Sequence, residues 1–205
     1  MPPALSMHAY TDNASMLNPF RHPARLCGRH NLVVLLIAAS SLAACSPALD
    51  WRDIRPKDID ILLTFPCKPQ QIAQNVQLAG KIVRMSMTGC ATDGMTFALA
   101  HADMGDRTLV GPALAALHTV ALQNVAGRVA HSQPAGVVHA AHDLPDALDL
   151  EIAGKSPSGK PLRERVVLFA QGTQVFQITT FAQTSRYRAD AAQTFSSSIR
   201  LPAPG

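Results

Sequence analysis

Apolar residues alternate with polar ones in several short stretches after residue 57, which is the pattern of half-buried β-strands. The first such stretch, residues 58–66, starts with Ile59 and Ile61 and ends at Pro66, which favours a strand that stops there. Further strands are predicted at 70–78, 81–90, 95–102, 147–153, 162–170 and 174–182.

Asp93-Gly94 provides the clearest turn signal, because glycine accepts a positive φ at no steric cost. It predicts a hairpin between strands 81–90 and 95–102. We expect one side of this hairpin to carry the apolar side chains Val83, Met85 and Met87 together with Phe97 and Leu99.

Two stretches change to a spacing of three to four residues, which predicts helices. The first, residues 112–125, begins at Pro112 and ends near Gly127. The second, residues 185–198, is expected to be capped by Thr184 or Ser185. Residues 128–145 are predicted to be irregular, with at most a short strand at 137–138. The chain is therefore predicted to be of the α+β class, an antiparallel sheet of about six strands with two helices packed on it.

A secretion signal is indicated upstream of the strands. Arg21, Arg25 and Arg29 precede the apolar residues 31–42, and small residues follow. This apolar stretch is shorter than the roughly 20 residues that a transmembrane helix needs. Met7 or Met16 is an alternative start, and Met16 would leave residues 1–15 untranslated. A buried N-terminal helix is the alternative reading, but a helix that is apolar on all sides would be costly to expose.

The signal ends in Leu42-Ala43-Ala44-Cys45, which closely resembles the bacterial lipobox. The resemblance implies that the Cys45 thiol receives a diacylglyceryl group, that residues 1–44 are removed, and that the acyl chains anchor the protein in a membrane. Ser46 in place of an aspartate implies the inner leaflet of the outer membrane, facing the periplasm. Residues 45–57 would then be a tether and residues 58–205 a single domain.

Of the four cysteines, Cys27 leaves with the signal and Cys45 takes lipid, so that Cys67 and Cys90 remain. An even pair in an oxidising compartment predicts a disulfide. A metal-binding or reactive pair is the alternative, but it calls for further ligands or a close C-x-x-C spacing.

The overall charge is small. The full chain carries a formal charge of +4, and loss of residues 1–44 leaves 15 basic and 13 acidic side chains. So slight an excess does not favour a nucleic-acid-binding protein.

Histidines in the irregular segment are weak candidates for a metal site: His131, His139 and His142. Their spacing matches no ligand motif, so solvated loop histidines are the preferred interpretation and no metal or other cofactor is predicted. His118 is expected to be a partly buried structural histidine. His101 and Asp103 are also potential ligands, but no metal site is expected at these residues either.

Three further groups of residues could take part in calcium binding, hydrolysis or anion binding. Asp103 and Asp106 offer too few oxygens for a calcium loop, so a polar turn is expected. Ser132, His131 and Asp143 lack the glycine-flanked elbow of a hydrolase nucleophile, and we do not expect an enzyme. A basic cluster near a predicted hairpin loop is expected to be a solvated surface, with anionic lipid or an acidic partner as the alternative. Its members are Lys155, Lys160, Arg163, Arg165, Arg186 and Arg188.

The order of elements from Asp58 to Leu201 resembles the PsbP-like fold, which is shared by an oxygen-evolving-complex subunit and a Ran-release factor. The features that carry the resemblance are Thr64-Phe65-Pro66, the Asp93-Gly94 hairpin, the late hairpin through Gly172, and helix 189–198 running into Ile199-Arg200-Leu201. It implies a binding or assembly factor that acts on envelope proteins. The alternative is a lipoprotein that binds a small molecule or metal.

Overall fold

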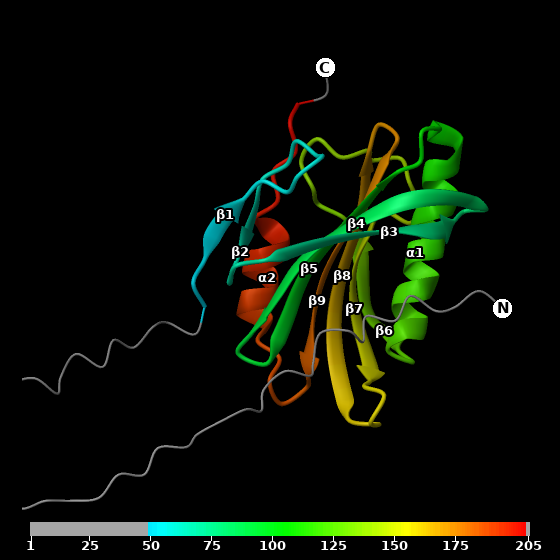
Figure 1. Cartoon of the computed structure of the whole chain (residues 1–205). Helices are drawn as coiled ribbons and strands as arrows, with labels where there is room; N and C mark the ends of the chain where they lie inside the picture. The colour runs from blue at the N-terminus through cyan, green and yellow to red at the C-terminus, as the bar shows by residue number, and fades with distance from the viewer. Residues whose placement is uncertain (1–48, 204–205) are drawn as a thin grey trace, which may run out of the picture. The chain divides into compact units, whose positions relative to one another are not determined.

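The computed structural model describes residues 49–203. Its elements are shown in Figure 1 and run in the order β1 (Arg52–Ile54), β2 (Leu63–Phe65), β3 (Gln70–Leu78), β4 (Lys81–Thr92), β5 (Met95–Asp103), a short 3-10 helix (Arg107–Leu109), α1 (Val110–Asn124), β6 (Arg128–Pro134), β7 (Leu148–Lys155), β8 (Pro161–Gln171), β9 (Gln174–Gln183) and α2 (Ala189–Ser197).

Seven strands form one antiparallel sheet in the order β3-β4-β5-β9-β8-β7-β6. Two meanders, β3 to β5 and β6 to β9, meet where β5 pairs with β9. Helix α1 connects them and carries the chain from the middle of the sheet to its far edge. The predicted α+β class is confirmed, but the prediction of six strands is wrong, because the main sheet has seven and β1 and β2 form a second small sheet.

Each face of the sheet buries its own apolar cluster, since side chains alternate between the faces of a strand. On one face, α1 packs against residues such as Met85, Leu150 and Leu168. On the other face lie α2 and β2 (Figure 1). The cluster buried there contains several phenylalanines. The ring of Phe195 on α2 makes edge-to-face contacts with Phe65 at 4.9 Å and Phe97 at 5.3 Å. We call these the α1 face and the α2 face.

The hairpin at Asp93-Gly94 is present, and both residues have positive φ values of 50° and 73°. Its predicted common apolar side is wrong. Thr92 pairs with Met95, so each odd residue of β4 lies opposite an even residue of β5. Val83 and Met85 therefore face α1, and Phe97 and Leu99 face α2.

Two other elements differ from the prediction. β6 lies in the segment predicted to be irregular, whereas 137–138 is not a strand. All seven β6 side chains are exposed, so this edge strand has no apolar alternation by which to recognise it. Helix α2 begins at Ala189 rather than near Ser185, because Arg188 at its N-cap is still extended.

The folded domain begins earlier than predicted, because part of the expected tether 45–57 belongs to it. Arg52–Ile54 pairs with β2, and the indole of Trp51 contacts the Phe97 ring at 6.3 Å. The strand predicted at 58–66 is reduced to Leu63–Phe65 and an isolated bridge from Leu62 to Arg200, and Asp58 has a φ of 69° in the preceding loop. No helix within residues 49–203 has the length and apolar character needed to cross a membrane.

Cys67 and Cys90 form a disulfide, with their Cα atoms 6.1 Å apart, so the predicted pairing is confirmed. The bond joins the segment that follows β2 to the end of β4. It therefore holds the small β1–β2 sheet against the main sheet.

Replacing both cysteines, by Cys67→Ser and Cys90→Ser together, is expected to lower the free energy of unfolding by about 3 kcal/mol. The bond closes a loop with a sequence separation of 23 residues, and a loop near that size restricts the unfolded chain by this amount. Urea unfolding of the double variant and the oxidised wild type measures the difference. A loss below about 1 kcal/mol would show that the bond is not a stabilising crosslink.

Candidate functional site

A groove of about 620 Å³ opens over β3 and β4 on the α2 face. Three segments line it: the end of β1 with the loop after it, the start of β3 with the two residues before it, and every second residue of β4. The lining residues are Ile54, Arg55, Pro56, Lys57, Asp58, Lys68, Pro69, Gln70, Gln71, Ile72, Ala73, Arg84, Ser86 and Thr88.

The floor of the groove follows from strand register. Thr88 pairs with Gln71 and Ser86 pairs with Ala73, so these residues point to the same face of the sheet. Arg84 lies two residues before Ser86 on β4, so its side chain points to the same face and continues the row. Arg84, Ser86 and Thr88 therefore present a guanidinium and two hydroxyls in line along the floor.

The wall is tied to the floor at two points. Gln71 accepts a hydrogen bond from the backbone N–H of Lys57 at 3.4 Å and donates one to the Lys57 carbonyl at 3.5 Å. At the other end, the Cys67–Cys90 disulfide is next to Lys68 in sequence. The groove therefore has a partly fixed shape even though a loop forms one side of it.

Positive charge exceeds negative charge around the groove. Four of the lining side chains are basic, and Asp58 is the acidic one. Arg55 is paired with Asp60 at 3.2 Å, outside the lining. Within residues 49–203, Lys57, Lys68 and Arg84 take part in no ion pair.

Two buried polar side chains have unused hydrogen-bonding atoms, Thr88 in the groove lining and His101 on the strand next to it. The Oγ1 of Thr88, a residue only 3% exposed, has no partner in the described part of the chain. His101 lies opposite Ser86 on β5, is 8% exposed, and its Nε2 also has no partner there. Burial lowers the pKa of His101, although the charge of Asp58 acts in the opposite direction. His101 is therefore mainly neutral at pH 7.

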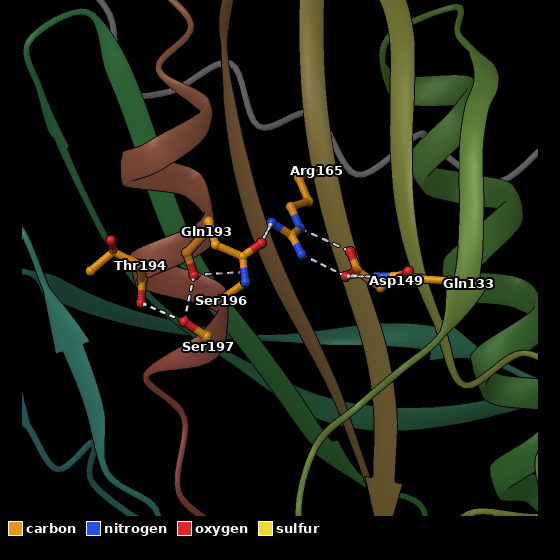
Figure 2. A network of polar contacts seen from close by, with 7 residues as sticks. All are labelled: Gln133, Asp149, Arg165, Gln193, Thr194, Ser196 and Ser197. Atoms are coloured by element: carbon orange, nitrogen blue, oxygen red, sulfur yellow. Dashed lines mark hydrogen bonds and ion pairs between the residues drawn. The ribbon is translucent and has the colours of Figure 1, made fainter.

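A second polar cluster lies between the sheet and α2 (Figure 2). Arg165 on β8 donates two hydrogen bonds to Asp149 on β7, at 2.9 and 2.6 Å, and a third to the side-chain oxygen of Gln193 on α2. Gln133 on β6 donates to Asp149 at 3.1 Å, and Ser196 and Ser197 donate to the Gln193 carbonyl. Because these groups satisfy one another, we interpret this cluster as a structural connection between α2 and three strands.

The three candidate metal ligands do not form a site. His131 is exposed on β6, and His142 is exposed in the loop before β7. His139 also lies in that loop, and its Nδ1 is 3.2 Å from the Leu201 carbonyl. No group of three His, Cys, Asp or Glu side chains within residues 49–203 is arranged to hold a metal ion.

The other predicted clusters have structural roles. Asp103 accepts hydrogen bonds from the Gly105 N–H and the Thr173 hydroxyl, and Asp106 caps the 3-10 helix by accepting from Thr108. His118 contacts Asp146 at 3.2 Å. These contacts match the expected polar turn and the expected structural histidine. Ser132, His131 and Asp143 make no hydrogen bond to one another in the described chain.

Three of the six members of the basic cluster are paired with acidic neighbours, whereas Lys155, Lys160 and Arg186 take part in no ion pair within residues 49–203. Arg163 pairs with Glu151, Arg165 with Asp149, and Arg188 with both Asp93 and Asp190. A guanidinium in such a pair offers little free charge to an anionic surface. Five of the six members are exposed, as predicted for a solvated surface, whereas the Arg165 side chain is only 12% exposed.

The groove was not predicted, although part of its signal lies in the sequence. Arg84, Ser86 and Thr88 alternate with Val83, Met85 and Met87, which shows that the second side of this strand is polar. The wall could not be foreseen, because it comes from segments that only the fold brings onto the strand.

Cys45 lies outside the described residues. No protein-family model matches the chain, and no curated protein matches its sequence.

Proposed function

We propose that this protein is a periplasmic lipoprotein, anchored through Cys45 to the inner leaflet of the outer membrane, whose domain acts as a non-enzymatic binding or assembly factor. The lipobox-like sequence Leu42-Ala43-Ala44-Cys45 after an apolar stretch carries this proposal. The Cys67–Cys90 disulfide supports an oxidising compartment such as the periplasm.

The start of the domain supports a position close to the membrane. Leu49 already packs against the α2-face cluster, and it lies four positions after Cys45, with three residues between them. An extended chain advances at most about 3.6 Å per residue, so the linker reaches about 14 Å at most. A partner of this domain would therefore be met at or near the lipid surface.

The fold supports a binding role by analogy. An antiparallel sheet covered on both faces, with a closing helix, is the arrangement that a PsbP-like fold implies, and we propose that the domain belongs to that class. A second candidate function, binding of a small molecule, is favoured by the groove over β3 and β4.

Cys45→Ser is expected to abolish lipid attachment. Wild-type cells fed labelled palmitate should yield a labelled mature protein in the membrane fraction. The variant has no thiol to accept the diacylglyceryl group, so it should carry no label and accumulate as the larger precursor.

Cys27→Ser is the matched control, because Cys27 leaves with the signal and its loss should change neither labelling nor processing. If the Cys45→Ser protein were still labelled and still cut before residue 45, the proposed anchor would be refuted.

A further inference from the structure

We propose that the groove over β3 and β4 binds an oxyanion, a phosphate or carboxylate group, carried by a small molecule with some apolar surface. This inference deepens the small-molecule candidate and does not depend on the lipid anchor. Three cations that take part in no ion pair within residues 49–203, Lys57, Lys68 and Arg84, line the groove and outnumber its single carboxylate, that of Asp58. Charges that lack a partner within the protein are the ones most available to an anionic ligand.

The floor supplies hydrogen-bond donors that suit the same ligand. The Thr88 hydroxyl is buried and lacks a partner in the described residues, and Ser86 lies in the same row two residues away. A buried hydroxyl without a partner lowers the stability of the protein, so a ligand oxygen that accepts a hydrogen bond from it would recover part of that cost. A phosphate or carboxylate has oxygens enough to accept from a hydroxyl and a cation at once.

The shape of the groove favours a ligand larger than a bare ion. From Arg84 to Thr88 the floor extends about 14 Å, given a rise of about 3.4 Å per residue. Beside the charges the walls present apolar side chains, among them Ile54, Pro56 and Pro69. An anionic head would lie on the floor while the remainder of the molecule contacts these side chains.

Two sources provide this chemistry at the proposed location. One is a soluble organic anion, and the other is the phosphate of a phospholipid headgroup, which the short linker after Cys45 would bring close. Both present the same oxygens to the same side chains. The experiment below therefore includes an arm that separates them.

Calorimetric titration of the full protein as purified from cells, in a neutral detergent without phosphate such as a maltoside, tests the proposal, with butyl phosphate and butyrate as probes and butanol as the uncharged control. We expect saturable binding of at least one anion and none of butanol. Lys68→Gln with Arg84→Gln should weaken binding at least tenfold, and Thr88→Val should weaken it severalfold. The matched control, Lys155→Gln with Lys160→Gln, removes the same charge at the β7–β8 turn and should bind like the wild type.

Absence of saturable binding by both anions would overturn the proposal. So would equal weakening by the two double variants, because that result would mean a general charge effect. Titration in vesicles of phosphatidylcholine with phosphatidylglycerol, compared with titration in the phosphate-free detergent, separates the two sources. Weaker butyl phosphate binding in the vesicles would identify the headgroup as the ligand, and unchanged binding would identify a soluble anion. These binding results would remain valid even if the Cys45→Ser experiment refuted the lipid anchor.

Discussion

Glu164→Gln is expected to remove most of the pH dependence of this domain's stability between about pH 5 and pH 8. Glu164 lies on β8 between Ile152 of β7 and Phe181 of β9, and shares the α1 face with Leu162 and Val166. It is 4% exposed, and its Oε2 has no hydrogen-bond partner in the described residues. Burial raises the pKa of this carboxyl from 4.5 to about 8.

The direction of the effect follows from proton binding. Between pH 4.5 and about 8 the folded protein holds a proton on Glu164 that the unfolded chain has released. Stability therefore falls as the pH rises through this range and levels off above it. A pKa difference of this size corresponds to a loss of the order of 5 kcal/mol in the free energy of unfolding.

Urea unfolding at pH 5 and pH 9, with the disulfide intact, measures the effect. Wild-type protein should be markedly less stable at pH 9, whereas Glu164→Gln should lose little and exceed the wild type there. Glu151→Gln on the neighbouring strand is the control, because Glu151 is half-exposed and paired with Arg163. If Glu164→Gln kept the wild-type pH dependence, Glu164 would not be the buried acid responsible.

Asp149→Asn is expected to cost about 3–5 kcal/mol of stability, because it leaves the guanidinium of Arg165 buried without its counter-charge. The two side chains are 12% and 11% exposed and share two hydrogen bonds (Figure 2). Loss of this pair should also loosen α2, since Arg165 is the link from the sheet to Gln193.

Urea unfolding at pH 7 measures this cost, with two further variants for comparison. Glu151→Gln breaks an ion pair whose side chains are 44% and 43% exposed, and should cost less than about 1 kcal/mol. Asp149→Leu with Arg165→Met replaces both charges by apolar groups and should regain most of the loss. An Asp149→Asn protein as stable as the Glu151→Gln protein would contradict the interpretation of a buried pair.

Elements whose sequence signal is local were predictable. The Asp93-Gly94 hairpin requires only a turn that accepts positive φ, and the apolar spacing of α1 and α2 is visible within each helix. The disulfide was predicted by counting the cysteines that would remain after the expected removal of residues 1–44. By contrast, β6 is fully exposed at the edge of the sheet, and β1 has three residues, so neither has a periodic signal.

Buried charge was the main feature that sequence reasoning misjudged. Arg163, Glu164 and Arg165 together suggest a solvated stretch, but strand alternation puts Glu164 on the α1 face and both arginines on the α2 face. Glu164 lies two residues from both Leu162 and Val166, so the alternation in the sequence already indicates that it shares their buried face. The groove depended on more than alternation, because its wall is placed by the β1–β2 pairing and the disulfide.

Intact-mass and N-terminal peptide analysis of the protein purified from membranes tests the central proposal most directly. The proposed account predicts a mature chain that begins at Cys45 and carries the mass of a diacylglyceryl group, usually with one further acyl chain. A chain that begins elsewhere, or an unmodified Cys45, would contradict it.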